Sequence, residues 1–165
     1  MCSPRRKPWV SERNNASPDG AEEMSLSSLH VHFVFGTKHR QPMITPELRP
    51  RLHAYLGGIA RELNAKEVIV NGTADHVHML VTIPAKLAVS DVARVLKANS
   101  SKWAGPDFGW QSGYAAFTVS TSNMPDVVAY IRDQEQHHRE RSYEEELVAL
   151  LKKHGVAYDP AYLCD

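Results

Sequence analysis

Two histidines separated by one residue, His76 and His78, are the first candidates for chemistry in this sequence. They lie in the segment 75–83, which is rich in β-branched and apolar residues, and this pattern predicts a buried strand. Successive side chains of a strand point to opposite faces, so the two imidazoles share one face while Val77 and Met79 share the other. Two imidazoles on one face can occupy two positions around one metal ion. The same spacing also fits a pair of polar residues at a strand edge, so both interpretations remain open at this point.

A tyrosine and a glutamine form the second candidate pair. Tyr130 and Gln134 lie in the predicted helix 127–139, and residues four apart on a helix lie one above the other on the same face. A phenol that reaches a metal-bound phosphate can act as a nucleophile, and an amide oxygen one turn further on can bind the same metal. Taken alone, Tyr130 also fits an ordinary position on an amphipathic helix.

Further histidines supply alternatives. His30 and His32 repeat the same spacing in the first predicted strand, and His137 and His138 follow Gln134. A structural zinc site built from His76, His78 and the pair 137–138 is one alternative, although no thiolate accompanies it. The two cysteines, Cys2 and Cys164, stand at opposite ends of the chain and do not form a close-spaced pair.

The elements that must position these residues follow the order β-α-β-β-α-β with helices appended. The strands are predicted at 29–35, 65–71, 75–83 and 114–120, and the helices at 47–64, 90–103, 127–139 and 143–154. Asn71-Gly72 predicts a hairpin turn between the second and third strands. The order is that of an α+β, ferredoxin-like (RRM-like) fold, a four-stranded antiparallel sheet with helices on one face and C-terminal helices carrying the tyrosine. In the last of these helices, Glu144, Glu145 and Glu146 are expected to complement the positive end of the helix dipole.

Composition places the chain among ordinary globular proteins. Its 165 residues, 42% hydrophobic and 23% charged, suffice for one domain, predicted at 25–165. Residues 1–24 are polar and contain three prolines, so a disordered N-terminal tail is expected there. No apolar run is long enough to span a bilayer, and the N-terminus lacks the apolar core of a signal peptide. A cytoplasmic location is therefore expected.

The net charge is zero, but the charges are unevenly distributed along the sequence. Residues 25–102 contain ten Lys and Arg against five Asp and Glu, whereas residues 103–165 contain five against ten. This asymmetry predicts one basic surface that can contact a phosphate backbone, and an acidic C-terminal part. The candidate DNA-contacting side chains are Lys38 and Arg40 after the first strand, and Arg94 and Lys97 on the second helix.

As an ordered set, these features resemble the single-tyrosine HUH transposases of insertion sequences (the TnpA type), which move their elements as single-stranded DNA. The resemblance runs from about Ser28 to the C-terminus. It is carried by residues 32–38 with Arg40, residues 75–81, residues 114–120, and residues 130–134 followed by His137 and His138.

The resemblance implies a role for four residues. His76 and His78 match the two metal-binding histidines, Gln134 the third ligand, and Tyr130 the nucleophile. His30 and His32 do not match the metal position and are expected to be structural. The family further implies a homodimer, in which the tyrosine helix of one subunit can complete the site of the other.

The implied activity is metal-dependent cleavage and rejoining of single-stranded DNA at hairpin-marked ends through a 5′-phosphotyrosine intermediate, with Mg²⁺ or Mn²⁺ as cofactor. Because the phosphotyrosyl bond conserves the energy for rejoining, no nucleotide cofactor is expected, and the sequence contains no P-loop. The alternative from another class is a non-catalytic or domesticated nucleic-acid-binding ferredoxin-like module.

Overall fold

A four-stranded antiparallel sheet forms the centre of the structure, a computed structural model that describes residues 26–163. The predicted disordered tail at 1–24 lies outside the described residues. The strands are β1 (His30–Gly36), β2 (Lys66–Gly72), β3 (His76–Thr82) and β4 (Ala115–Val119). The helices are α1 (Leu48–Glu62), α2 (Val89–Ala104), α3 (Met124–Arg132), α4 (Gln134–Glu140) and α5 (Tyr143–Lys153), with short 3-10 turns η1 (Lys38–Arg40), η2 (Thr121–Asn123) and η3 (Pro160–Tyr162). Within the described part of the chain, no helix is both long and apolar enough to cross a membrane.

The strand order is β2-β3-β1-β4, so the first and third strands lie in the middle of the sheet. In the register, Val34 is opposite His78 and Gly36 is opposite His76. Together with the element order, this arrangement confirms the predicted ferredoxin-like α+β fold.

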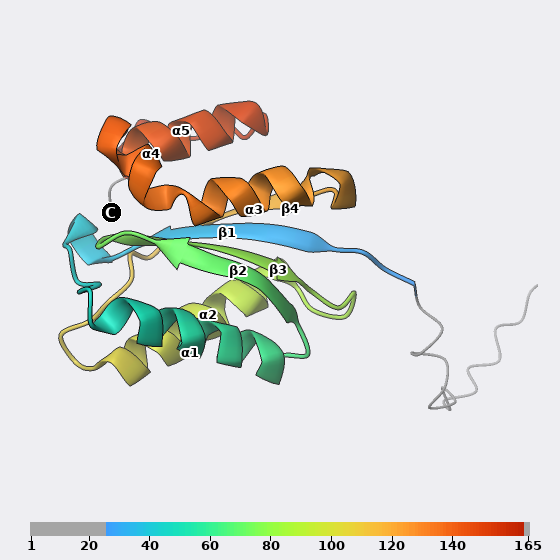
Figure 1. Cartoon of the computed structure of the whole chain (residues 1–165), viewed down its shortest axis with the longest axis horizontal. Helices are drawn as coiled ribbons and strands as arrows, with labels where there is room; N and C mark the ends of the chain where they lie inside the picture. Colours follow the sequence, from blue (N-terminus) through green and yellow to red (C-terminus); the bar gives the residue numbers. More distant parts are fainter. Residues whose placement is uncertain (1–25, 164–165) are drawn as a thin grey trace, which may run out of the picture.

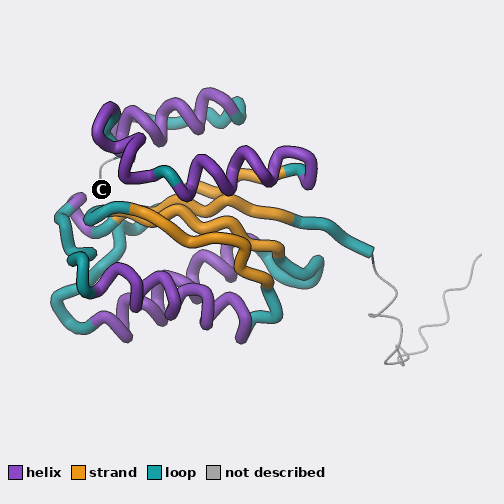
Figure 2. The backbone as a smooth tube through the Cα atoms, viewed as in Figure 1, coloured by secondary structure: helices purple, strands orange, loops and turns teal. Residues whose placement is uncertain are grey.

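The two faces of the sheet carry different side chains because neighbouring residues of a strand alternate. One face carries the buried apolar residues Phe33, Phe35, Val77 and Met79, which pack against α1 and α2 in the largest apolar cluster. Each large apolar side chain buried in this way contributes about 1.5–3 kcal/mol. The opposite face carries the four strand histidines, and α3, α4 and α5 cover it, so the sheet lies between two helical layers (Figures 1 and 2).

The predicted helix 127–139 is in fact two helices. Asp133, with φ −92° and ψ 22°, separates α3 from α4. The side-chain amide of Asn71, on β2, donates hydrogen bonds to the carbonyl oxygens of Ile131 and Arg132 at 2.9 and 2.8 Å. These bonds satisfy carbonyls that the end of a helix leaves unpaired. Asn71 is therefore a strand residue that holds the end of α3, and the turn between β2 and β3 lies at 73–75 rather than at Asn71-Gly72.

Candidate metal centre

His76 and His78 lie fully buried on one face of β3, as their spacing predicts. Their rings are 5.2 Å apart, centroid to centroid. The C-terminal helices bring His138 and Glu146 to the same place, and one ligand atom from each of these four residues lies within 4.8 Å of the others. We call these four residues the histidine–glutamate cluster. Imidazole nitrogens and a carboxylate are common ligands of divalent metal ions, so the cluster could hold one.

Asp75 orients His76. Its Oδ1 lies 2.7 Å from His76 Nδ1. Its Oδ2 forms an ion pair with Arg40 and accepts a hydrogen bond from the guanidinium at 2.6 Å. Burial alone would raise the pKa of the Asp75 carboxyl, but the hydrogen bond with His76 and the charge of Arg40 lower that pKa to about 2. An ionised carboxylate can only accept hydrogen bonds, so His76 Nδ1 carries the hydrogen. Nε2 faces the cluster, and in the neutral ring it carries the lone pair, as in the carboxylate–histidine–metal arrangement.

We expect an Asp75→Ala variant to bind Mn²⁺ about 10–100-fold more weakly than the wild type, because loss of the carboxylate leaves the tautomer and orientation of His76 unfixed. Isothermal titration calorimetry of the metal-free protein with Mn²⁺ measures this directly. Asp107→Ala, which removes an exposed carboxyl from a loop, is the matched control. An unchanged Mn²⁺ affinity in Asp75→Ala would show that Asp75 does not support the metal ligand.

His32 contacts the second histidine of the pair. Its Nε2 lies 2.9 Å from Nδ1 of His78, and both side chains are buried. Burial lowers the pKa of His32 well below its usual value and lowers that of His78 to about 4, so both rings are neutral near pH 7. Metal binding through His78 Nε2 requires that Nδ1 donate its hydrogen to His32. His32, expected from the sequence to be structural, thus directly contacts the candidate centre, whereas His30 bonds to Thr82.

Gln134 begins α4 and is fully buried beside the histidines. Its amide nitrogen donates to Glu146 Oε1 at 3.0 Å, which leaves its Oε1 3.3 Å from His76 Nε2. A carbonyl oxygen and an imidazole lone pair that face each other repel unless a proton or a cation lies between them. The structure therefore brings Gln134 and both predicted histidines together with an acceptor geometry that suits a cation.

Glu146, on α5, is the residue that the sequence reasoning missed. It is only 6% exposed, and its Oε1 accepts a hydrogen bond from the Tyr130 hydroxyl while its Oε2 lies 2.8 Å from His138 Nε2. Burial alone would raise the pKa of this carboxyl, but contacts with His138 and His78 lower it below its ordinary range. Burial and the adjacent Glu146 charge raise the pKa of Tyr130 above its usual value.

The helical spacing of α5 contained a signal for this burial. Tyr143, Leu147 and Leu151 form its apolar face, and Glu146 falls on the same face by the helical repeat. Its neighbour Glu145 instead closes a capping box with Ser142, so the three acidic residues have different environments. An ionisable residue at an apolar-face position indicates a buried charge that must have partners.

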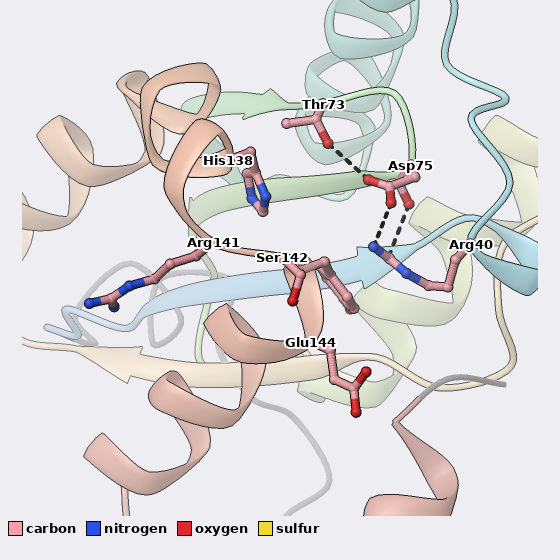
Figure 3. Close-up of a pocket in the computed structure, with 8 residues that line it drawn as sticks. Arg40, Thr73, Asp75, His138, Arg141, Ser142 and Glu144 are labelled. Carbon is pink, nitrogen blue, oxygen red and sulfur yellow. Dashed lines mark hydrogen bonds and ion pairs between the residues drawn. The ribbon is translucent and has the colours of Figure 1, made fainter.

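Two cavities flank the cluster. The first, of about 390 Å³, has His138 on one side and Arg40 with Asp75 on the other (Figure 3). The second, of about 360 Å³, borders Tyr130 and Glu146 and also includes Lys153. The first cavity therefore borders the cluster at His138 and the second borders it at Glu146, while His76 and His78 lie buried between them.

The four predicted DNA-contacting residues lie in two places. Lys38 and Arg40 belong to η1, and the Arg40 guanidinium also lies 3.5 Å from the ring centre of Tyr143. Arg94 and Lys97 belong to α2, on the opposite face of the sheet from the cluster. Lys97 donates to the carbonyl oxygens of Ser112 and Gly113, and Arg94 pairs with Asp91. Contact of all four with DNA stays a prediction.

The two histidines of α4 also lie in different places. His138 joins the cluster, whereas His137 lies beside Tyr130 with ring centroids 5.0 Å apart. The alternative four-histidine zinc set is thus not brought together as such, since Glu146 is the fourth residue of the group.

Comparison with known proteins places these features in context. Residues 25–134 match the sequence model of a family described as "Transposase IS200 like". The transposases for insertion sequence element IS200 of Salmonella typhimurium and Salmonella typhi are each 31% identical over 114 residues, covering 62% of this chain and 74% of theirs. The ISDra2 transposase TnpA of Deinococcus radiodurans is 25% identical over 119 residues, covering 64% and 84%.

A similar fold is found in the solved structure of a REP-associated tyrosine transposase bound to a REP hairpin. The TM-score is 0.57 with 16% identity, and the superposition covers 84% of this chain and 74% of the other.

Proposed function

The chain belongs to the IS200-like family of transposases, and from this premise we propose that it cleaves and rejoins single-stranded DNA at hairpin-marked ends with Tyr130 as nucleophile. The observation that carries the proposal is the convergence of Tyr130, Gln134 and the two β3 histidines through the buried carboxylate of Glu146. A binding module without chemistry has no need of a half-buried phenol that contacts a buried carboxylate at a candidate metal centre.

His76, His78 and Gln134 are proposed to hold a divalent cation, Mg²⁺ or Mn²⁺. The donor set fits, because His78 Nε2 is buried without a hydrogen-bond partner among the described residues and the Gln134 oxygen faces His76 Nε2. Mg²⁺ prefers oxygen ligands, whereas Mn²⁺ also accepts imidazole. The bound cation would offset the charge of the phosphodiester oxygens and orient the group for in-line attack.

Tyr130 would attack the scissile phosphorus. Its phenolic oxygen forms a bond to phosphorus while the bond to the 3′ oxygen breaks, which leaves a 5′-phosphotyrosine and a free 3′-hydroxyl. Because the pKa of the phenol is raised, it keeps its proton at neutral pH, so attack must release that proton while the leaving 3′ oxygen takes one up. Rejoining is the same exchange in reverse, with a 3′-hydroxyl displacing the tyrosine.

DNA is proposed to approach through the two cavities beside the cluster. The first carries Arg40 and Arg141, and the second carries Lys153, side chains that suit phosphate oxygens. The related fold solved with a REP hairpin supports hairpin DNA as the ligand class. The homodimer implied by the sequence resemblance stays a prediction; in the single chain, Tyr130 already contacts Glu146 of its own site.

The test is covalent adduct formation on labelled, hairpin-forming single-stranded DNA taken from the sequence that flanks the gene. With Mg²⁺ or Mn²⁺ we expect a protein–DNA band that survives a denaturing gel, and we expect chelation by EDTA to abolish it, because the phosphate charge is then no longer offset. Re-adding Mn²⁺ in excess of EDTA restores the band and controls for unfolding. Clear DNA binding without any adduct at any metal concentration would instead favour the non-catalytic binding module.

A further inference from the structure

Building on the metal centre of the proposed function, we propose that Glu146 is a further protein ligand of the cation through Oε2 and positions the nucleophile Tyr130 through Oε1. Glu146 lies on α5, twelve residues beyond the segment 25–134 that matches the family. The family match therefore says nothing about this residue, and the assignment rests on its contacts.

The distances around Oε2 are those of atoms that share an ion. Two donor atoms that are each about 2.1 Å from one metal lie about 3.0 Å apart at a right angle and about 3.4 Å apart at the tetrahedral angle. Glu146 Oε2 lies 3.4 Å from His78 Nε2 and 3.8 Å from His76 Nε2. Gln134 Oε1 lies 3.3 Å from His76 Nε2. The separations of 3.3 and 3.4 Å match this spacing, and that of 3.8 Å corresponds to a wider angle at the metal, so Oε2 is close enough to each histidine nitrogen to share one ion with it.

The surroundings of His78 Nε2 support the same assignment. His78 is 0% exposed, and its Nε2 makes no hydrogen bond to any described residue although it faces the Glu146 carboxylate. A buried polar atom without a hydrogen-bond partner destabilises the folded state. A cation between this nitrogen and Oε2 would give His78 Nε2 a partner, while Oε2 keeps its 2.8 Å contact with His138 Nε2.

The other oxygen of the same carboxylate faces the nucleophile. Oε1 accepts hydrogen bonds from the Tyr130 hydroxyl and from the Gln134 amide nitrogen. One side chain thus connects the tyrosine of α3, the glutamine of α4 and the histidines of β3. This contact would hold the phenol beside a bound cation, as near-attack geometry requires.

Calorimetric titration of the full-length, metal-free protein with Mn²⁺ tests the ligand role without any DNA. We expect Glu146→Gln, which keeps the shape and removes the charge, to weaken Mn²⁺ binding about 100-fold, in line with the upper range for groups that support a metal. Glu144→Gln is the matched control, because this exposed carboxylate lies on the same turn of α5 and points away from His138 (Figure 3); its affinity should stay within about twofold. The visible absorption of bound Co²⁺ should also change in Glu146→Gln, because the ligand set changes.

Three outcomes would overturn part or all of the proposal, and a fourth would contradict the proposed function alone. A folded Glu146→Gln protein with wild-type Mn²⁺ affinity and an unchanged Co²⁺ spectrum would overturn the ligand role. If that variant does not fold, Glu146→Asp, which keeps the charge on a shorter side chain, should bind Mn²⁺ with intermediate affinity, and wild-type affinity there would overturn it equally. At Mn²⁺ concentrations that saturate Glu146→Gln, the adduct rate should still be about 10-fold lower, and full recovery would overturn the positioning role. If the wild-type protein binds Mn²⁺ but forms no adduct with the DNA, the proposed function is contradicted and the ligand assignment stays intact.

Discussion

A Tyr130→Phe variant should form no detectable covalent adduct with hairpin DNA, a loss of at least about 1,000-fold, because the phenolic oxygen is the atom proposed to join phosphorus. The substitution removes one oxygen and keeps the ring against His32 and His78. Glu146 Oε1 retains the hydrogen bond from Gln134, so the free energy of unfolding should change by only about 1 kcal/mol. Adduct formation is measured on a denaturing gel over a range of Mn²⁺ concentrations.

Two further measurements separate loss of the nucleophile from loss of the site. Mn²⁺ affinity and binding of the hairpin should stay near wild type in Tyr130→Phe, because neither requires the hydroxyl. Tyr55→Phe is the matched control, since Tyr55 lies on α1, on the other side of the sheet, stacked on Trp103; its adduct yield should equal that of the wild type. An adduct that persists in Tyr130→Phe would keep the enzymatic activity and assign the nucleophile to another residue.

Gly72→Ala should destabilise the protein by about 3 kcal/mol and lower its melting temperature by roughly 6–12 °C. Gly72 ends β2 opposite Val77, and a Cβ there would lie 2.2 Å from the His76 carbonyl oxygen and 2.9 Å from Val77 Cα. Both are backbone atoms, so relief requires the β2–β3 hairpin itself to move. Because that movement displaces His76, Mn²⁺ affinity should fall together with stability.

Thermal unfolding followed by circular dichroism measures the first effect, and calorimetric titration the second. Gly113→Ala is the control, since a Cβ at Gly113 meets nothing within 4 Å, and its melting temperature should be unchanged or slightly higher. A Gly72→Ala protein as stable as the wild type would mean that the hairpin adapts freely and does not fix the position of His76.

Helix α5 would take part in the proposed chemistry through these contacts. It supplies Glu146 to the cluster and packs its apolar residues against Val34 and Phe117 of the sheet. Variants that loosen this packing should therefore affect metal binding as well as stability. In this respect the centre depends on residues outside the segment that identifies the family.

Local patterns in the sequence were sufficient to predict the strands, the side of the sheet that carries His76 and His78, and the family. Strand alternation places His76 and His78 on one face with Val77 and Met79 on the other, and the structure agrees because that periodicity depends only on the backbone of one strand. The element order likewise predicts the ferredoxin-like sheet, since short connections restrict how such strands can pair.

Only the tertiary structure decided which charged groups meet at the centre. Arg40 and Asp75 are 35 positions apart, and Tyr130 and Glu146 are 16 apart, so no periodic pattern connects either pair. The break at Asp133, the use of Asn71 to hold the end of α3, and the packing of α5 over the sheet determine these contacts. Such contacts depend on how complete elements pack, which the residues of one element do not specify. The sequence therefore determined the side of the sheet that carries the histidines, and packing determined that Glu146 joins them.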